Sequence, residues 1–456
     1  MSIREPGGAA RRMRSTAGPV VTGSRLVHWV EVHRRLALGL ILLLALAFGA
    51  VRIGTDPPTM STGQTERWWP VVLDLLQGQG YVQCIPEYFP FCGAGNRVTA
   101  MREPAPVLLF AAAARLAGPS LLAASILELV LNLAIVLGVF LLTREWAGGR
   151  AALLAALFWA AYLPAIKLVP QVSAELLAAV GVTWGVFSYL RARRTGRARD
   201  WVAAGACMGV GGLSRSPLLV VALVLAAGLL VSPPAATDRG RRFSWPLLRP
   251  AVLFSLAVLA VISPWLARND AVFGRPMPST LVGYNLYRHN HMIAADRFSP
   301  RFVGSDEARQ AILALVSRRP DLRGSENEAQ MDAVYKSEAL RVIVAHPARY
   351  FFLCAYRFLP LWFNWGIKEA GGGRTGALDY LMILQQIVLL VTALAGWRCR
   401  RPLAWPLAIG VVALSVAYMA VNSQMRFIIP VMPLVASLSA MGCLSVARRA
   451  GRGGRT

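Results

Sequence analysis

The stretch "LALGLILLLALAFGAV", residues 36 to 51, contains no charged side chain. Similar runs occur at 218 to 231, "LLVVALVLAAGLLV", and at 251 to 265, "AVLFSLAVLAVISPW". Lipid offers no hydrogen bonds to the backbone, so such runs cross it as helices, each needing about 20 mostly apolar residues. The chain of 456 residues is 56% hydrophobic and only 16% charged. It is therefore predicted to be an all-α polytopic membrane protein.

Hydropathy predicts about ten spans, separated by two long polar stretches. The spans lie near 36–53, 119–142, 150–168, 174–191, 201–216, 218–232, 251–267, 376–396, 403–421 and 427–447. We call residues 54–118 the first loop and residues 268–348 the second loop. Residues 349–366 are aromatic and carry an arginine, so they are predicted to form an interfacial helix or one extra span.

The formal net charge is +25, from 48 basic and 23 acidic residues. The arginines cluster between spans rather than on one face, which argues against nucleic-acid binding and predicts which loops are cytoplasmic. The clusters lie at 11–14, 34–35, 191–199, 239–242, 398–401 and 448–449. This bias predicts a plasma-membrane protein with both termini in the cytoplasm and both long loops outside.

Five regions follow from this pattern. They are a basic cytoplasmic N-terminus (1–35), an N-terminal membrane module that includes the first loop (36–267), the second loop (268–348), a C-terminal membrane region (349–447) and a basic tail (448–456). No signal-peptide cleavage site is convincing, so the first span is expected to be retained.

The first loop carries signals for two short helices that lie on the membrane surface. Ser61 and Gln64 have the spacing of a capping box before an apolar run, and Pro104 opens a second such segment. Trp68 and Trp69 suit the membrane interface. Cys84 and Cys92 lie in the same loop, where they are either bridged or two free thiols.

Several sequence blocks together resemble the GT-C glycosyltransferases that use polyprenyl-phosphate sugars, a group that includes protein O-mannosyltransferases and the lipid A aminoarabinose transferase. The order and spacing of the blocks carry the resemblance over most of the chain. The blocks are "LLQGQGY" (75–81), "REPAPVLLF" (102–110), "PQVSAELLA" (170–178), "AAGACMGVGGLSRSPLL" (203–219), "SPWLARNDAVFG" (263–274), "GYNLYRHN" (283–290), "AHPARYF" (345–351) and "MRFIIPVMPL" (425–434).

The resemblance implies transfer of a sugar from a lipid phosphate to a lipid, glycan or protein acceptor on the outer face, in one inverting displacement. The family's usual base is an aspartate some fourteen residues before the "GxG", a position held here by Gln64. An amide cannot accept the proton of the acceptor hydroxyl. Glu66 and Asp56 are the carboxylates that could replace the aspartate, while Gln64 either caps a helix or binds substrate.

A lipid phosphate gains negative charge as it leaves, and fixed guanidinium groups would stabilise that charge. Four arginines at predicted outer span ends are candidates: Arg102, Arg215, Arg268 and Arg426. Arg426 holds the arginine position of the family's "R-x-x-x-P" pattern. Glu175 resembles a residue that faces the family's cavity. Further candidates for binding substrate are Asn269, Asn285 and His289.

Other functions remain open on the sequence alone. A flippase or transporter of lipid-linked sugars would need polar groups in mid-span, and a ligase of lipid-linked polysaccharide would also be polytopic with a large outer loop. An inactive relative is a further alternative, because Gln64 replaces the expected acid. No metal-ligand spacing and no nucleotide-binding glycine motif is found, so neither a metal nor a cofactor is predicted.

Overall fold

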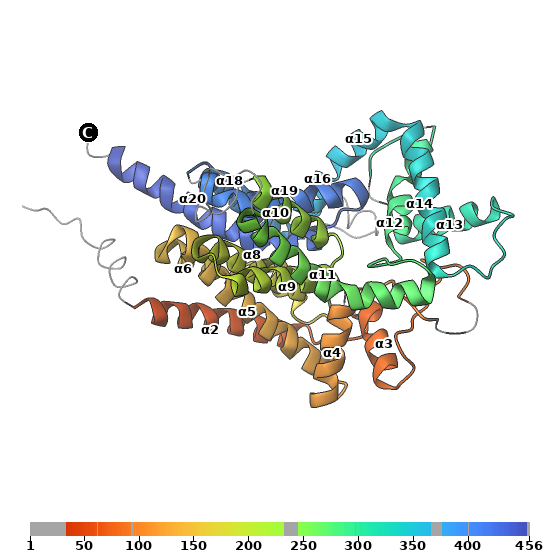
Figure 1. Cartoon of the computed structure of the whole chain (residues 1–456), viewed down its shortest axis with the longest axis horizontal. Coiled ribbons are helices and arrows are strands. Elements are labelled where there is room, and N and C mark those ends of the chain that lie inside the picture. The colour runs from red at the N-terminus through yellow and green to blue at the C-terminus, as the bar shows by residue number, and fades with distance from the viewer. Residues whose placement is uncertain are drawn as a thin grey trace, which may run out of the picture.

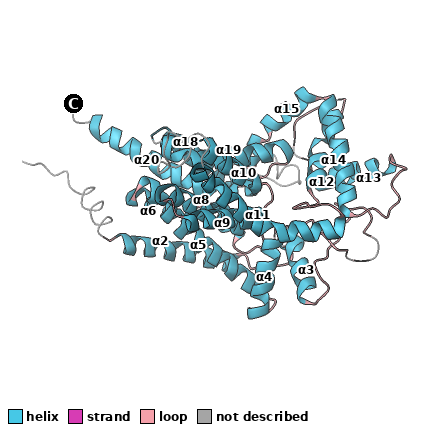
Figure 2. Cartoon of the chain, in the orientation of Figure 1, coloured by secondary structure: helices cyan, strands magenta, loops and turns pink. Residues whose placement is uncertain are grey.

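The computed structural model describes residues 33–61, 63–92, 95, 97–231, 245–296, 298–301, 303–365, 376–399 and 401–453. Most of the predicted basic N-terminus, the arginine clusters at 11–14 and 239–242, and the last residues of the tail lie outside these ranges. All helices and strands assigned to the described residues are in fact helices (Figure 2). Val82 and Val98 form an isolated antiparallel β-bridge between two loop segments.

The membrane part consists of helices packed side by side, most of them long (Figure 1). They are α2 (Arg34–Thr55), α5 (Leu121–Ala147), α6 (Gly149–Ala160), α7 (Leu163–Leu168), α8 (Glu175–Thr195), α9 (Ala198–Ser214), α10 (Leu218–Val231), α11 (Trp245–Phe273), α18 (Ala377–Cys399), α19 (Arg401–Val421) and α20 (Met432–Gly453). Within the described ranges, six helices are long and apolar enough to cross a membrane. The predicted all-α polytopic fold is confirmed.

Two predicted spans differ from the helices in detail. The expected span at 150–168 is divided into α6 and α7, because Pro164 in the first turn of α7 cannot continue an α-helix from the preceding turn. The last predicted span, 427–447, lies within the apolar helical segment Met425–Ala450, which begins as the 3₁₀ helix η2 (Met425–Val431) with Pro430 and continues as α20.

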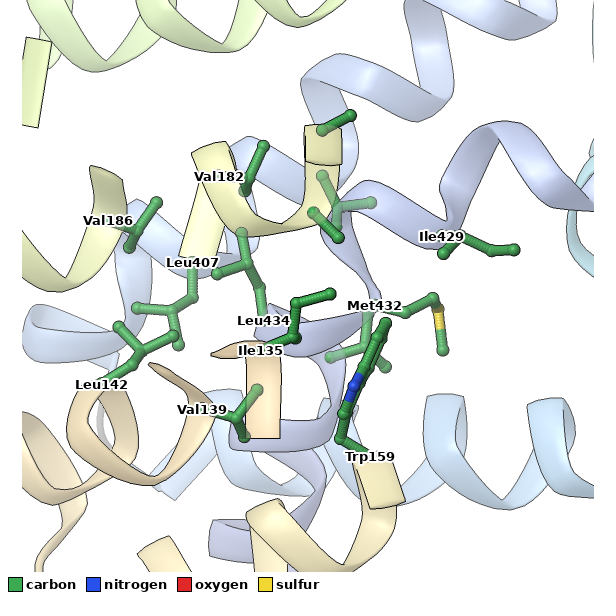
Figure 3. Packing of buried hydrophobic residues seen from close by; sticks show 14 of the residues in the cluster. Ile135, Val139, Leu142, Trp159, Val182, Val186, Leu407, Ile429, Met432 and Leu434 are labelled. Carbon is green, nitrogen blue, oxygen red and sulfur yellow. The ribbon is translucent and has the colours of Figure 1, made fainter. Parts of the chain in front are cut away.

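A continuous apolar core joins these helices. Figure 3 shows Ile135 and Val139 of α5, Trp159 of α6, Val182 of α8 and Met432 of α20 directed into it. Helices α18 and α20 approach so closely that a Cβ on Gly396 would lie 1.9 Å from the carbonyl oxygen of Leu438. Small residues allow such contacts between membrane helices, where packing supplies much of the attraction.

The first loop forms α3 (Thr65–Leu76) and α4 (Pro104–Ala117), as predicted. The predicted capping box is wrong, because Gln64 is itself the residue before the helix and its side chain makes no capping hydrogen bond. Trp68 and Trp69 also differ from the prediction. They are buried against Val107 and Phe110 of α4 instead of lying at the membrane interface.

The second loop forms α12 (Val282–Asn290), η1 (His291–Ala294), α13 (Ser305–Ser317) and α14 (Glu328–Ala345). The following residues form α15 (Pro347–Tyr356) and α16 (Phe358–Phe363), which are too short to span a bilayer. No extra span therefore exists in the described part of 349–366. Both loops lie at the same end of the membrane helices, away from the C-terminus (Figure 1).

Candidate active site

A polar cavity of about 230 Å³ lies where the two loops meet the ends of the membrane helices, and we call it the central cavity. A more apolar side cavity of about 140 Å³ adjoins it between α12 and α19. The two cavities share Arg102, Arg215, Leu281, Asn285, Asn422 and Phe427. A ligand with a polar head and an apolar tail would match this pair of cavities.

Five arginines line the central cavity: Arg67, Arg102, Arg215, Arg288 and Arg426. Two of them are held by Glu175, which stands in the first turn of α8 and is 0% exposed. Arg215 donates a hydrogen bond to Glu175, and Arg426 lies 3.9 Å from the same carboxylate oxygen. We call Glu175, Arg215 and Arg426 the Glu175 set. The Nε groups of both arginines are buried and have no hydrogen-bond partner in the part of the chain that the structure describes.

Arg102 belongs to the first loop and lines both cavities. Its Nε donates to the backbone carbonyl of Arg67 at 3.2 Å, and its guanidinium lies over the rings of Trp68 and Tyr88. Its Nη2 is buried and has no partner among the described residues. Arg102, Arg215 and Arg426 thus line one cavity and each carry an unsatisfied N–H donor, an arrangement suited to an anion.

A second arginine pair is held by Glu87 of the first loop. Arg288 Nη1 donates to Glu87 at 2.8 Å, and Arg67 Nη2 lies 3.9 Å from the other carboxylate oxygen. We call Glu87, Arg67 and Arg288 the Glu87 set. Sequence reasoning missed all three residues, because the contact between Glu87 and Arg288 spans 201 positions and leaves no local pattern.

The disulfide between Cys84 and Cys92 is present and encloses Glu87. Tyr88, from the same short loop, packs on Tyr284 of α12 with ring centroids 4.7 Å apart. The bridge left open by the sequence therefore fastens a segment that forms part of the wall of the central cavity.

The two predicted bases occupy different environments. Glu66 lies in the first turn of α3, lines the central cavity and has a side chain that is 57% exposed. Its nearest cation is Arg67, at 3.6 Å. Asp56 instead follows the last turn of α2, where it pairs with Arg52. It is not among the residues that line either cavity.

Gln64, Asn285 and His289 all line the central cavity. His289 is buried, and its burial together with the charges of Arg288 and Arg357 lowers its pKa well below the usual value. Its imidazole is therefore neutral near pH 7, a form able both to donate and to accept a hydrogen bond.

Arg268 and Asn269 line neither of the two cavities. Arg268 donates to the backbone carbonyl of Thr99 at 2.8 Å and stacks on Trp265, while Asn269 donates to the carbonyl of Met277. These contacts join the first loop to α11.

Glu103 was also missed, although it follows Arg102 directly. It is buried beside the side cavity, and its Oε1 accepts hydrogen bonds from the backbone N–H and the hydroxyl of Ser216, at 3.1 and 3.0 Å. Within the described ranges, no group of three or more His, Cys, Asp or Glu side chains is arranged to hold a metal ion.

Comparison with known proteins gives one partial family match and several structural matches. A family model for dolichyl-phosphate-mannose-protein mannosyltransferases matches residues 102–267, little more than a third of the chain. No curated protein matches the sequence significantly.

Two solved structures of the oligosaccharyltransferase from Archaeoglobus fulgidus resemble the chain, each with a TM-score of 0.54. The form tethered to an acceptor peptide with the NVT sequon is 15% identical and is matched over 92% of this chain and 50% of its own length. The form bound to an inhibitory peptide and a dolichol-phosphate is 16% identical, with 92% and 51% covered. The present chain thus spans about half the length of these relatives, and the likeness shows a shared fold.

Proposed function

We propose that this chain, whose membrane fold is that of the GT-C glycosyltransferases, moves a sugar from a polyprenyl-phosphate donor to a lipid, glycan or protein acceptor. The observation that carries the proposal is that Arg102, Arg215 and Arg426 all line the polar central cavity, and that Arg102 and Arg215 also border the apolar side cavity. Each has a buried N–H group without a partner among the described residues, as a phosphate site requires.

In this proposal the lipid tail lies along the side cavity and the phosphate sits against the Glu175 set. The acceptor hydroxyl attacks the anomeric carbon from the face opposite the phosphate, and its proton passes to Glu66. The bond between the anomeric carbon and the phosphate oxygen breaks, which releases polyprenyl phosphate and inverts the anomeric configuration. The fixed arginines stabilise the charge that develops on the leaving phosphate more than they stabilise the bound donor.

The distribution of charge supports a site on the outer face of the plasma membrane. The arginine clusters at 34–35, 191–199 and 448–449, together with Arg398, lie at the helix ends opposite the two loops. Clusters of this kind are retained in the cytoplasm, so the loops and the central cavity would face outward.

Release of polyprenyl phosphate by the purified chain in lipid discs tests the proposal. A panel of polyprenyl-phosphate sugars is supplied with a membrane extract as the source of acceptor. We expect turnover with at least one donor and a loss of about 10²–10⁴-fold in Glu66→Gln, the usual contribution of a general base. Asp56→Asn is the matched control, because Asp56 lies in the same loop but outside both cavities.

Two results would contradict parts of this assignment. Loss of turnover in Asp56→Asn with full turnover in Glu66→Gln would transfer the role of base to Asp56. Absence of turnover with every donor and extract would reject the transferase.

A further inference from the structure

Two sets of the same composition, each formed by one glutamate and two arginines, border the central cavity through their arginines. The Glu175 set comes from α8, the end of α9 and η2, whereas the Glu87 set comes from the disulfide loop, α3 and α12. The proposed reaction places the lipid phosphate at the Glu175 set. The second set therefore has no ligand in the reaction as proposed above.

Arg288 shows that the Glu87 set is built for a ligand. Its side chain is only 9% exposed and lines the central cavity. Glu87, the hydroxyl of Tyr284 and the hydroxyl of Ser305 accept hydrogen bonds from its two Nη groups. Its Nε is buried and has no partner among the described residues. A buried N–H donor of a cation that lacks an acceptor costs free energy unless a ligand supplies one.

The charges around the central cavity leave room for a second anion. Five arginines line it, and the carboxylates paired with them are those of Glu66, Glu87 and Glu175, which leaves two positive charges. The donor is a phosphodiester with a single negative charge and neutralises one of them. The other positive charge, in a partly enclosed cavity, favours a second anion.

The position of the Glu87 set identifies which substrate carries that anion. Arg215 borders both cavities, so the Glu175 set is adjacent to the apolar space suited to the donor lipid. Arg67 and Arg288 border only the central cavity, and Arg67 lies beside Glu66, the proposed base. The acceptor hydroxyl must approach Glu66, so a group bound by the Glu87 set belongs to the acceptor.

We infer that the Glu87 set is a second anion site and that the acceptor carries a phosphate or carboxylate group close to the hydroxyl that receives the sugar. The assignment to the acceptor rests on the proposed function, whereas the anion site itself does not. If the acceptor were neutral, it would supply no anion to accept a hydrogen bond from the buried Nε of Arg288.

The anion site is tested by titrating inorganic phosphate into the full chain in phosphatidylcholine discs, with binding followed by ³¹P NMR. The protein is first saturated with polyprenyl phosphate, which fills the Glu175 set. We expect one further phosphate to bind, and its affinity to fall at least tenfold in Arg288→Gln while polyprenyl phosphate binding stays unchanged. Arg301→Gln is the matched control, because Arg301 is paired with Glu307 and lies outside the central cavity.

Equal phosphate binding in the wild type, Arg288→Gln and Arg301→Gln would mean an adventitious ion only and would overturn the inference. Arg67→Gln repeats the test at the more exposed arginine of the set, in case Arg288→Gln does not fold. If polyprenyl phosphate fails to bind while one phosphate still depends on Arg288, the proposed function fails and the anion site stands.

A second experiment addresses the acceptor. Labelled neutral sugar is transferred from a polyprenyl-phosphate donor to a membrane extract that has been separated by anion exchange. We expect labelled product from the anionic fraction and little from the neutral fraction. Since the donor sugar is neutral, the charge of the product must come from the acceptor. Equal labelling of both fractions would overturn the inference about the acceptor.

Discussion

The two glutamate–arginine sets of the central cavity differ in how they are held. Glu175 is 0% exposed and belongs to a membrane helix, while the side chain of Glu87 is 21% exposed and belongs to a loop closed by a disulfide. Helix packing fixes the first set, and one covalent bridge with a few hydrogen bonds fixes the second. The comparison indicates that the proposed donor site is rigid and that the proposed acceptor site can be altered separately.

The largest effect is expected from Glu175→Gln, which leaves Arg215 and Arg426 together without their shared anion. Breaking a buried ion pair in this way costs about 3–5 kcal/mol. We expect a lower apparent melting temperature in lipid discs and a loss of polyprenyl phosphate turnover of at least about 100-fold, as for a lost transition-state contact.

Glu338→Gln is the matched control for that variant. Glu338 also pairs with two arginines, Arg319 at 3.6 Å and Arg341 at 2.9 Å, but its side chain is 17% exposed and those of the arginines are 28% and 73% exposed. Solvent-accessible pairs of this kind contribute about 0–1 kcal/mol, so this variant should retain its stability and turnover. Equal effects of the two variants would contradict the special role of the Glu175 set.

A smaller effect is expected from replacing Cys84 and Cys92 together by serine. The bridge closes a short loop, and its loss should cost about 2–3 kcal/mol through the entropy of the unfolded chain. Because Glu87 lies inside that loop, phosphate binding at the Glu87 set should weaken while polyprenyl phosphate binding is retained. Cys354→Ser, a change at a free cysteine, serves as the control. Parallel loss of both ligands would show that the sets are not independent.

The smallest effect concerns Asp332, which supports the helix that carries Arg288. Its carboxylate accepts hydrogen bonds from the backbone N–H groups of Gly283, at 2.6 Å, and Tyr284, at 3.3 Å. Burial raises the pKa of Asp332 to about 7, despite the nearby charges of Lys336 and Arg275.

A carboxyl group with a raised pKa in the folded state binds protons more tightly there than in the unfolded state. Stability should therefore fall as the pH rises from about 4 to about 7 and then level off, with an amplitude below about 2 kcal/mol for this partly exposed group. Melting curves between pH 4 and 8 should lose this component in Asp332→Asn. Taking the difference between the two proteins removes the contribution of His289. An unchanged pH profile in the variant would contradict the assignment of this pH dependence to Asp332.

Much of the fold could be predicted because its signals are local. The span predicted at 36–53 is α2, Arg34–Thr55, since an uninterrupted apolar run defines both the helix and its ends. The division of the span at 150–168 was missed, although Pro164 was visible in the sequence. The cap at Gln64 was wrong because a spacing of polar residues does not determine where a helix begins.

The site was predictable only in part. Arg102, Arg215 and Arg426 were candidates because arginines at predicted outer span ends oppose the usual charge bias. The partnership of Glu175 with Arg426 spans half the chain, so it depends on tertiary packing that no local pattern records. The same holds for Glu87 and Arg288. Sequence patterns therefore identified individual charged residues, whereas the ion pairs between them could be recognised only in the folded structure.

The two sets are tested most directly by a structure of the chain in lipid discs, determined by electron cryo-microscopy with polyprenyl phosphate bound. We expect the phosphate to lie within hydrogen-bond distance of Arg215 and Arg426, with the lipid tail leaving through the side cavity between α12 and α19. A phosphate bound instead at Arg67 and Arg288, or a tail that leaves by another route, would contradict the assignment of the two sets.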